Sequence, residues 1–421
     1  MTSLPKVFVF TIACLVLGAA KAEVKTALEK HLDHPDQQLF FSAENLNVNN
    51  HRLEGLPYAL CKTVKEATSS RLTEMRCKIV VHSQTPPEKS CNISLIAAPS
   101  TATTHSRIGN LIKLIKFGSQ KAVLLWFEES IVPSVGVFKG KIRSSIVDLT
   151  TCQSKEVVLL EEMINSSNIV AYANVIPYED SFDVIIGFPT AEWYKFSVDS
   201  KGRVTENKPG WVKSGHWISQ FTSVASGSRS KGYLRFNEEF NFSGRRNLKS
   251  EIILIKPDGS QKQLMDQTVT GKKSVSTVHQ AISIAFAVND KTVKIQKFDQ
   301  EGNSKLHFSV DFDYTIANLL IRNLADGGFL LLTTSKDKPY HVTKLDSSGQ
   351  RIGHLELGAG FKKNHGVTSY LYSETVALED DPSGGYCLSS VYSPTIKGQL
   401  REESDLDLLV KCFSDSDFFS A

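Results

Sequence analysis

The sequence between residues 323 and 357 contains three short strand-like runs in succession, separated by turn signals. Asp326-Gly327-Gly328 precedes an apolar run at 329–334, and a second run at 340–345 ends at Asp346-Ser347-Ser348-Gly349. β-Branched and aromatic residues between Gly, Pro and Asp are typical of antiparallel strands joined by short turns. This stretch therefore predicts a three-stranded meander, and it constrains the fold because the same pattern recurs along the chain.

The last of these strands and its turn can be aligned in five places. The aligned acids are Asp148, Asp199, Asp258, Asp299 and Asp346, at spacings of 51, 59, 41 and 47 residues. The segment 408–417 fits the same frame with Phe413 in the Asp position. An Asp at the start of a turn accepts hydrogen bonds from backbone amides about two residues on, and a Gly at its end supplies positive φ. The residue types are thus explained by turn mechanics alone.

Repeats of this length, with three or four short strands each, indicate an all-β fold of the β-propeller class. Asp326-Gly327-Gly328-Phe329, followed by a strand and Lys344-x-Asp346-x-x-Gly349, resembles the repeat of many secreted and bacterial propellers. The resemblance covers roughly residues 100–420 and implies an architecture without a specific enzyme family.

Counting third strands predicts seven blades. They span residues 50–100, 104–155, 166–208, 214–266, 275–308, 313–357 and 366–417. Six blades is the alternative, because the first repeat is the weakest match, and a pair of β-sandwiches is the competing fold. Two sandwiches would not explain the near-regular turn spacing.

The first 22 residues predict a secretory signal peptide. Lys6 precedes the apolar run 7–17, and small residues lead to Ala22, where we expect cleavage. The apolar run is too short to cross a bilayer as a helix, and no later segment is apolar enough to span one. Cleavage removes Lys6 and Lys21 from 48 basic residues, leaving 46 against 45 acidic ones, a net charge of +1. That balance gives no reason to expect a nucleic-acid partner.

Residues 23–49 are expected to form an N-terminal segment ahead of the propeller at 50–421. Val24, Leu28 and Leu32 stand four apart, which predicts two helical turns ending by Pro35. Residues 37–42 then form a strand without a local partner. We expect this strand to run antiparallel beside residues 408–413 and close the ring, because an unpaired edge invites aggregation.

Six cysteines remain after cleavage, and an even number in an exported chain favours disulfides. In an antiparallel hairpin, the two residue numbers of every directly opposed pair add up to the same value. Cys61 and Cys77 centre on a polar turn, and Cys387 and Cys412 centre on the loop 393–404, so each pair can bridge neighbouring strands. Cys91–Cys152 follows by elimination. Asn92, Asn165 and Asn241 lie in sequons, which predicts a glycoprotein.

Histidines precede the expected first strands of several blades, where connections gather at one mouth of the channel. They are His51, His105, His216, His279 and His365. Converging imidazoles could bind Zn or Cu. The alternative interpretation is structural, because Ser214-Gly215-His216-Trp217 resembles the Gly-His of WD40 repeats, where the histidine orients strands. No cofactor other than such a metal is expected.

Standard catalytic and phosphate-binding signatures are absent from the sequence. We therefore expect a secreted, non-enzymatic propeller that binds an extracellular protein or glycan through loops at one face. Basic clusters at 228–235, 244–249 and 362–363, in expected loops, could bind a polyanion such as a glycosaminoglycan, although solvated loop charge is the default interpretation. The rival hypothesis is a metal-assisted hydrolase or lyase with its site at the channel mouth. The tryptophans are expected to pack between blades.

Overall fold

A computed structural model gives the structure of the chain. It describes residues 26–33, 38–41, 57–65, 72–81, 89–97, 105–118, 120–132, 137–164, 172–187, 192–213, 218–226, 229–238, 248–269, 273–335, 340–357, 367–380, 385–396 and 405–418. The expected signal peptide at 1–22 lies outside these residues. Within them, no helix is long and apolar enough to cross a membrane.

The described strands form seven four-stranded antiparallel sheets. The first sheet contains β2 (Gln38–Phe41), β3 (Pro57–Lys65), β4 (Leu72–Val81) and β5 (Lys89–Ile96). The second contains β6 (His105–Phe117), β7 (Lys121–Val132), β8 (Val137–Asp148) and β9 (Ser154–Ile164). The third contains β10 (Tyr172–Pro177), β11 (Ser181–Gly187), β12 (Glu192–Asp199) and β13 (Val204–Lys213).

The fourth sheet contains β14 (Ile218–Ser226), β15 (Arg229–Glu238), β16 (Leu248–Ile255) and β17 (Gln261–Val269). The fifth contains β18 (Lys273–Ser276), β19 (Ala281–Ala287), β20 (Thr292–Asp299) and β21 (Ser304–Asp311). The sixth contains β22 (Asn318–Asn323), β23 (Phe329–Thr334), β24 (His341–Leu345) and β25 (Arg351–Glu356). The last contains β26 (Val367–Asp380), β27 (Tyr386–Ile396), β28 (Asp405–Phe413) and β1 (Thr26–Asp33).

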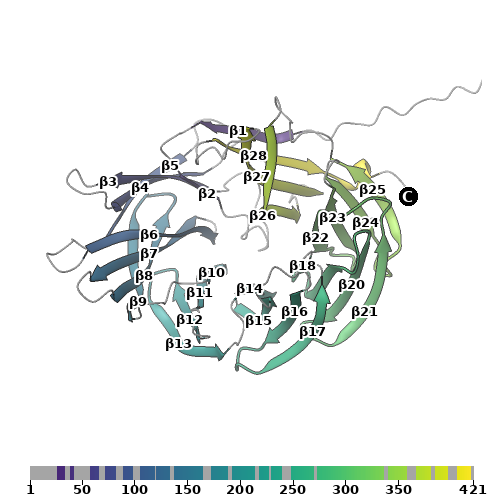
Figure 1. Ribbon diagram of the computed structural model, residues 1–421, viewed down its shortest axis with the longest axis horizontal. Helices are drawn as coiled ribbons and strands as arrows, with labels where there is room; N and C mark the ends of the chain where they lie inside the picture. The colour runs from purple at the N-terminus through teal and green to yellow at the C-terminus, as the bar shows by residue number, and fades with distance from the viewer. Residues whose placement is uncertain are drawn as a thin grey trace, which may run out of the picture.

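The sheets are arranged around a ring, with the first strand of each sheet innermost (Figure 1). First strands of neighbouring sheets contact one another, as β6 does with β2 and β10, and β22 with β18 and β26. This arrangement is a β-propeller, the fold class predicted from the repeats.

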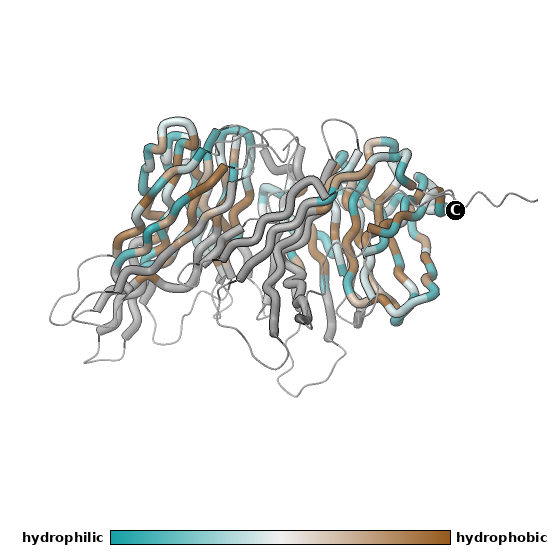
Figure 2. Tube along the Cα trace, turned by 90° about the horizontal axis from the view of Figure 1, so that it is seen from above, coloured by the Kyte–Doolittle hydropathy of each residue, from teal (hydrophilic) through white to brown (hydrophobic). Residues whose placement is uncertain are grey.

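Burial decreases from the second strand of a sheet to its outer strand. Every residue of β23 is buried, as are all but the first of β11 and β19. In contrast, β5 buries only alternate residues, and β21 buries only Val310. A strand with sheets on both sides carries a continuous apolar run, whereas a strand with one solvated face alternates. The hydrophobic clusters accordingly lie between neighbouring sheets, with hydrophilic turns at the rim (Figure 2).

The Asp turns have the predicted mechanics. Asp346 Oδ1 accepts hydrogen bonds from the backbone N–H groups of Ser348 (2.9 Å) and Gln350 (2.8 Å), and Gly349 has a φ of +90°. The other four aligned acids also accept backbone hydrogen bonds in their turns. Asp148, Asp199 and Asp299 end the third strand of their sheets and Asp346 directly follows it, as the alignment predicted, whereas Asp258 lies three residues after β16.

The prediction for the N-terminal segment was wrong in its strand assignment. Residues 38–41 form β2, which pairs with β3 and so begins the first sheet, with Phe40 opposite Ala59. The strand beside β28 is β1, with Glu29 opposite Leu409 and His31 opposite Asp407. Leu28 and Leu32 misled the prediction because a spacing of four residues fits one face of a strand as well as one face of a helix.

The three cysteine pairs of the structure are those expected from the sequence. Cys61 pairs with Cys77 across β3 and β4, and Cys387 with Cys412 across β27 and β28, each with a Cα–Cα distance of 4.0 Å. Cys91 pairs with Cys152, which joins the first sheet to the turn after β8. Cys91 lies on β5, the fourth strand of its sheet.

Candidate functional site

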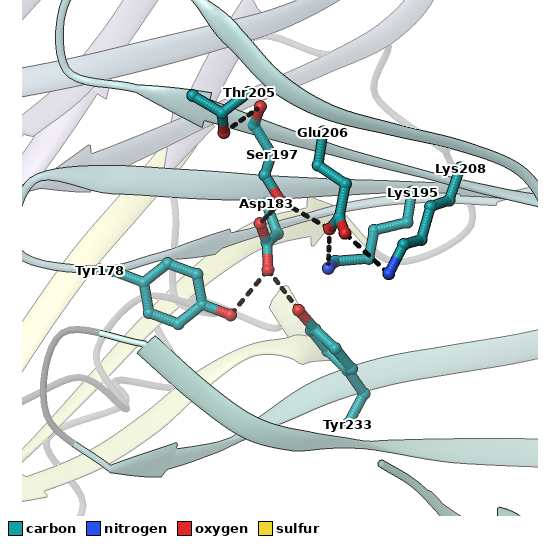
Figure 3. Close-up of polar contacts among 8 residues, drawn as sticks. All are labelled: Tyr178, Asp183, Lys195, Ser197, Thr205, Glu206, Lys208 and Tyr233. Atoms are coloured by element: carbon teal, nitrogen blue, oxygen red, sulfur yellow. Dashed lines mark hydrogen bonds and ion pairs between the residues drawn. The ribbon is translucent and has the colours of Figure 1, made fainter. Parts of the chain in front are cut away.

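A buried cluster of polar side chains lies between the third and fourth sheets. Asp183, on β11, has a side chain buried to 5% exposure. Its Oδ2 accepts hydrogen bonds from the hydroxyls of Tyr178 (2.9 Å) and Tyr233, and its Oδ1 accepts one from Ser197 Oγ at 2.6 Å (Figure 3). Tyr178 and Ser197 belong to the third sheet, and Tyr233 lies on β15 of the fourth. The carboxylate therefore joins two sheets.

Glu206, on β13, extends the cluster toward the surface. The ammonium groups of Lys195 and Lys208 bind its two carboxylate oxygens, with the Lys208 pair at 2.7 Å. Burial tends to raise the pKa of Glu206, but hydrogen bonds and charge from both lysines outweigh it and lower the pKa to about 2. The Lys195 ammonium also lies 5.9 Å from the ring centre of Trp211 and 5.3 Å from that of Tyr233.

This cluster has little capacity for chemistry. Burial raises the pKa of the Tyr233 hydroxyl, so this group remains a protonated donor. Asp183 already accepts three hydroxyl donors and is shielded from water. Hydrogen-bonded, desolvated polar groups of this kind fix one packing arrangement. We interpret the cluster as a structural contact that holds the two sheets in one packing arrangement.

The expected histidine ring at the channel mouth is not assembled by the described residues. His279 follows β18, the first strand of its sheet, whereas the sequence had placed it before that strand. His105 is the first residue of β6, so the two histidines stand at opposite ends of first strands. The difference arises because the short run Lys273–Ser276 is the first strand, so the apolar run that follows His279, Ala281–Ala287, is the second. His51, His216 and His365 lie outside the described residues.

A different group of metal-ligating side chains does come together. His341 on β24 and His354 and Glu356 on β25 place one donor atom each within 4.8 Å of one another. Sequence reasoning missed this group, although the signal was present. The two histidines flank the Asp346 turn, and the hairpin register sets His341 opposite Glu356 and Thr343 opposite His354. The residue-number argument that paired the cysteines would also have placed these residues on one face.

Other expected positions are partly described. Asn92 is exposed on the outer strand β5, while Asn165 and Asn241 lie outside the described residues. Trp126 and Trp193 are buried in clusters between neighbouring sheets, as predicted, and Trp211 packs partly buried against one of them. Trp217 lies outside the described part of the chain.

No protein-family model and no curated protein matches the sequence. Solved structures that resemble the fold include the β-propeller domain of the Trilobed protease from Pyrococcus furiosus, at 11% identity and a TM-score of 0.44 over 91% of this chain and 97% of that chain. A chain of the Mitotic Checkpoint Complex matches at 11% identity and a TM-score of 0.43 over 98% and 100% of the two chains. BBS1N, solved in complex with ARL6DN, matches at 11% identity and a TM-score of 0.41 over 92% and 96%.

Similarity at this level gives no indication of activity or ligand. The fold follows instead from the strand order, the ring of first strands and the clusters between sheets, which make this chain an all-β propeller.

Proposed function

We propose that this chain is an exported, disulfide-bonded, seven-bladed propeller that binds an extracellular protein or glycan through the connections of one face, without catalysis. Each four-stranded sheet is one blade, and β1 completes the last blade by pairing with β28. Closure of this kind gives a rigid scaffold without a long unpaired edge. Such scaffolds carry function in their connecting loops.

Export is supported by the cysteines and by Asn92. Six cysteines in three pairs are typical of an oxidising compartment. Asn92 and the Ser94 of its sequon are both exposed on β5, so the acceptor amide is accessible for glycosylation. The N-terminal 22 residues supply the sequence pattern of a signal peptide.

The observation that carries the binding hypothesis is the asymmetry of the connections. In a sheet of four consecutive antiparallel strands, the first-to-second and third-to-fourth connections lie at one edge. In the second to seventh sheets these connections have two to five residues. The second-to-third connections and the links between sheets join strand ends at the opposite edge, and four of these segments have eight to ten residues: 97–104, 239–247, 357–366 and 397–404. The first sheet departs from this pattern, because the segment 42–56 between β2 and β3 has fifteen residues.

Three of these segments, 239–247, 357–366 and 397–404, carry six basic residues against three acidic ones, Glu239, Glu402 and Glu403. They contain Arg245 and Arg246, Lys362 and Lys363, and Lys397 and Arg401. Guanidinium and ammonium groups recognise carboxylate and sulfate oxygens through charge-assisted hydrogen bonds. An acidic glycan is therefore the ligand class that this chemistry favours. We call this edge the long-loop face.

Binding is tested with the full chain secreted from eukaryotic cells and presented to immobilised sulfated glycans. We expect salt-sensitive binding that weakens roughly tenfold, or about 1.4 kcal/mol, in the double variant Lys362→Ala/Lys363→Ala. The matched control Lys201→Ala/Lys256→Ala removes two exposed lysine side chains from short turns of the other face and should leave binding unchanged.

Equal loss in both double variants would contradict a specific face, and absence of salt-sensitive binding would contradict an acidic glycan. The same preparation tests export. The mature N-terminus should be Glu23, and glycosidase treatment should increase electrophoretic mobility. Retention of the chain inside the cell with an uncleaved N-terminus would contradict export.

A further inference from the structure

The group formed by His341, His354 and Glu356 lies on the two outermost strands of the sixth sheet. β24 and β25 are the third and fourth strands of that sheet, so this group stands away from the innermost strands that line the ring. His341 is opposite Glu356, and His354 is opposite Thr343. Because side chains alternate along a strand, residues 341 and 343 share one face with residues 354 and 356. The hairpin register itself assembles the group.

The donor atoms are close to coordination distances. His341 Nδ1 lies 3.4 Å from His354 Nε2 and 3.9 Å from Glu356 Oε1. Tetrahedral Zn²⁺ with bonds of about 2.0–2.1 Å to His nitrogen separates its ligand atoms by roughly 3.3 Å. The two nitrogens already have that separation, whereas the carboxylate oxygen, which lies within 4.8 Å of both, has to move closer to complete the set.

The three side chains differ in how firmly they are held. His341 is buried, at 3% exposure, and stacks on Tyr314 of the adjoining sheet link at a centroid distance of 4.8 Å. The Tyr314 hydroxyl is in turn hydrogen-bonded to Thr333 Oγ1. His354 is half-buried and the Glu356 side chain is 42% exposed. One ligand is therefore fixed, and the other two can adjust around it with access from solvent.

The histidine rings stack at 23°, so a shared ion requires rotation of the His354 ring until its lone pair converges with that of His341. The surroundings favour a polar occupant. Thr343 Oγ1 is buried beside His354 in the register and has no hydrogen-bond partner among the described residues. A buried hydroxyl can orient a ligating imidazole or a metal-bound water, which is the usual role of groups around a metal centre.

We infer that His341, His354 and Glu356 bind a divalent first-row transition metal, with Zn²⁺ as the ion their chemistry suits. Two imidazoles and a carboxylate form a three-ligand set that leaves a fourth position for water or for a donor from a bound partner. The ion would fasten the outer strand β25 to β24. This site is separate from the channel-mouth histidines expected from the sequence, and it does not depend on the glycan-binding proposal.

The inference is tested by titrating untagged, chelator-stripped full chain with Zn²⁺ in competition with a chromophoric chelator. Histidines elsewhere could also bind Zn²⁺, so the informative quantity is the difference between wild type and variants. His354→Ala and Glu356→Gln are used because buried His341 could be needed for folding. Loss of a ligand should weaken one binding equivalent by about 100-fold or more, since loss of a supporting residue alone costs roughly 10–100-fold.

His307→Ala, an exposed histidine on β21 of the neighbouring sheet, is the matched control and should retain every equivalent. Saturating Zn²⁺ should also raise the melting temperature of wild type and of His307→Ala more than that of His354→Ala. Unchanged Zn²⁺ affinity in both ligand variants would overturn the inference, and so would an equal loss in His307→Ala. Circular dichroism of each variant separates loss of a ligand from loss of the fold.

Discussion

At the scale of single residues, Asp183 joins the third and fourth sheets through hydroxyl donors from both. Asp183→Ala would remove the carboxylate acceptor from two buried tyrosine hydroxyls, while Ser197 Oγ would keep Glu206 Oε2 at 3.2 Å. We expect it to lower the free energy of unfolding by about 3 kcal/mol or more, because a buried donor without a partner costs about 1–3 kcal/mol. Chemical denaturation measures the change.

Tyr233→Phe is the graded control for that substitution. It removes one donor but leaves Asp183 with Tyr178 and Ser197, so the expected loss is about 1–2 kcal/mol. A free energy of unfolding for Asp183→Ala equal to that of wild type would contradict the structural role of the cluster and would make it a candidate site of chemistry again.

Glu206 gives stability a dependence on pH. Its folded pKa of about 2 lies below the unfolded value near 4.3, because the lysines outweigh the effect of burial. A lowered folded pKa means that the carboxylate stabilises the fold above the unfolded pKa, and that this contribution disappears as pH falls toward 2. Glu206→Gln should therefore be destabilising at pH 6 and progressively less so between about pH 4.5 and 2.

Urea unfolding at several pH values tests this expectation, with Glu301→Gln in an exposed turn as the control. The Glu206 side chain is 31% exposed, so water screens the ion pairs and the effect should be modest. A difference between wild type and Glu206→Gln that does not change with pH would show that the lysine contacts do not act through the charge.

At the scale of strands and turns, the sequence predicts local backbone geometry wherever a single residue type determines it. Asp299 accepts the backbone N–H of Asn303, and Gly302 has a φ of +77°, so the turn at the end of β20 follows from its residue types. The spacing of Leu28 and Leu32 fits two periodicities, so β1 could not be distinguished from a helix. The hairpin register also predicts that His341, His354 and Glu356 share one face, although the sequence analysis used the register only to pair cysteines.

The disulfide between β27 and β28 belongs to this scale. Cys387 and Cys412 are 25 residues apart, and opening that loop costs roughly 3 kcal/mol in the chain-entropy model. The double variant Cys387→Ser/Cys412→Ser should therefore melt at a lower temperature and still bind its ligand when folded. Scanning calorimetry and the glycan-binding measurement provide the two readouts. Loss of binding by the folded variant would indicate a functional cysteine.

At the scale of the whole molecule, the least predictable feature was which terminal strand joins which sheet. β1 and β28 are separated by almost the entire chain, so no local pattern determines their pairing. β1 and β2 both come before β3 in the chain, so either strand was available to pair with β28. The choice depends on packing between neighbouring sheets, which a single sequence does not display.

The pairing of β1 with β28 is central to the account, because the proposed closure of the ring depends on it. Cysteines at cross-strand positions measure it directly. Two adjacent pairs, Glu29→Cys/Leu409→Cys and Lys30→Cys/Leu408→Cys, cover both alternating kinds of antiparallel position. Phe40→Cys/Val410→Cys tests the strand that the sequence had favoured.

Non-reducing peptide mapping of the secreted chain is the decisive measurement. We predict a fourth disulfide in at least one of the β1 pairs, since directly opposed residues lie within the roughly 4.4–6.8 Å Cα separation that a disulfide requires. We predict none between positions 40 and 410, because Phe40 lies opposite Ala59 in the first sheet. A bond between positions 40 and 410, with none at either β1 pair, would contradict the pairing of β1 with β28.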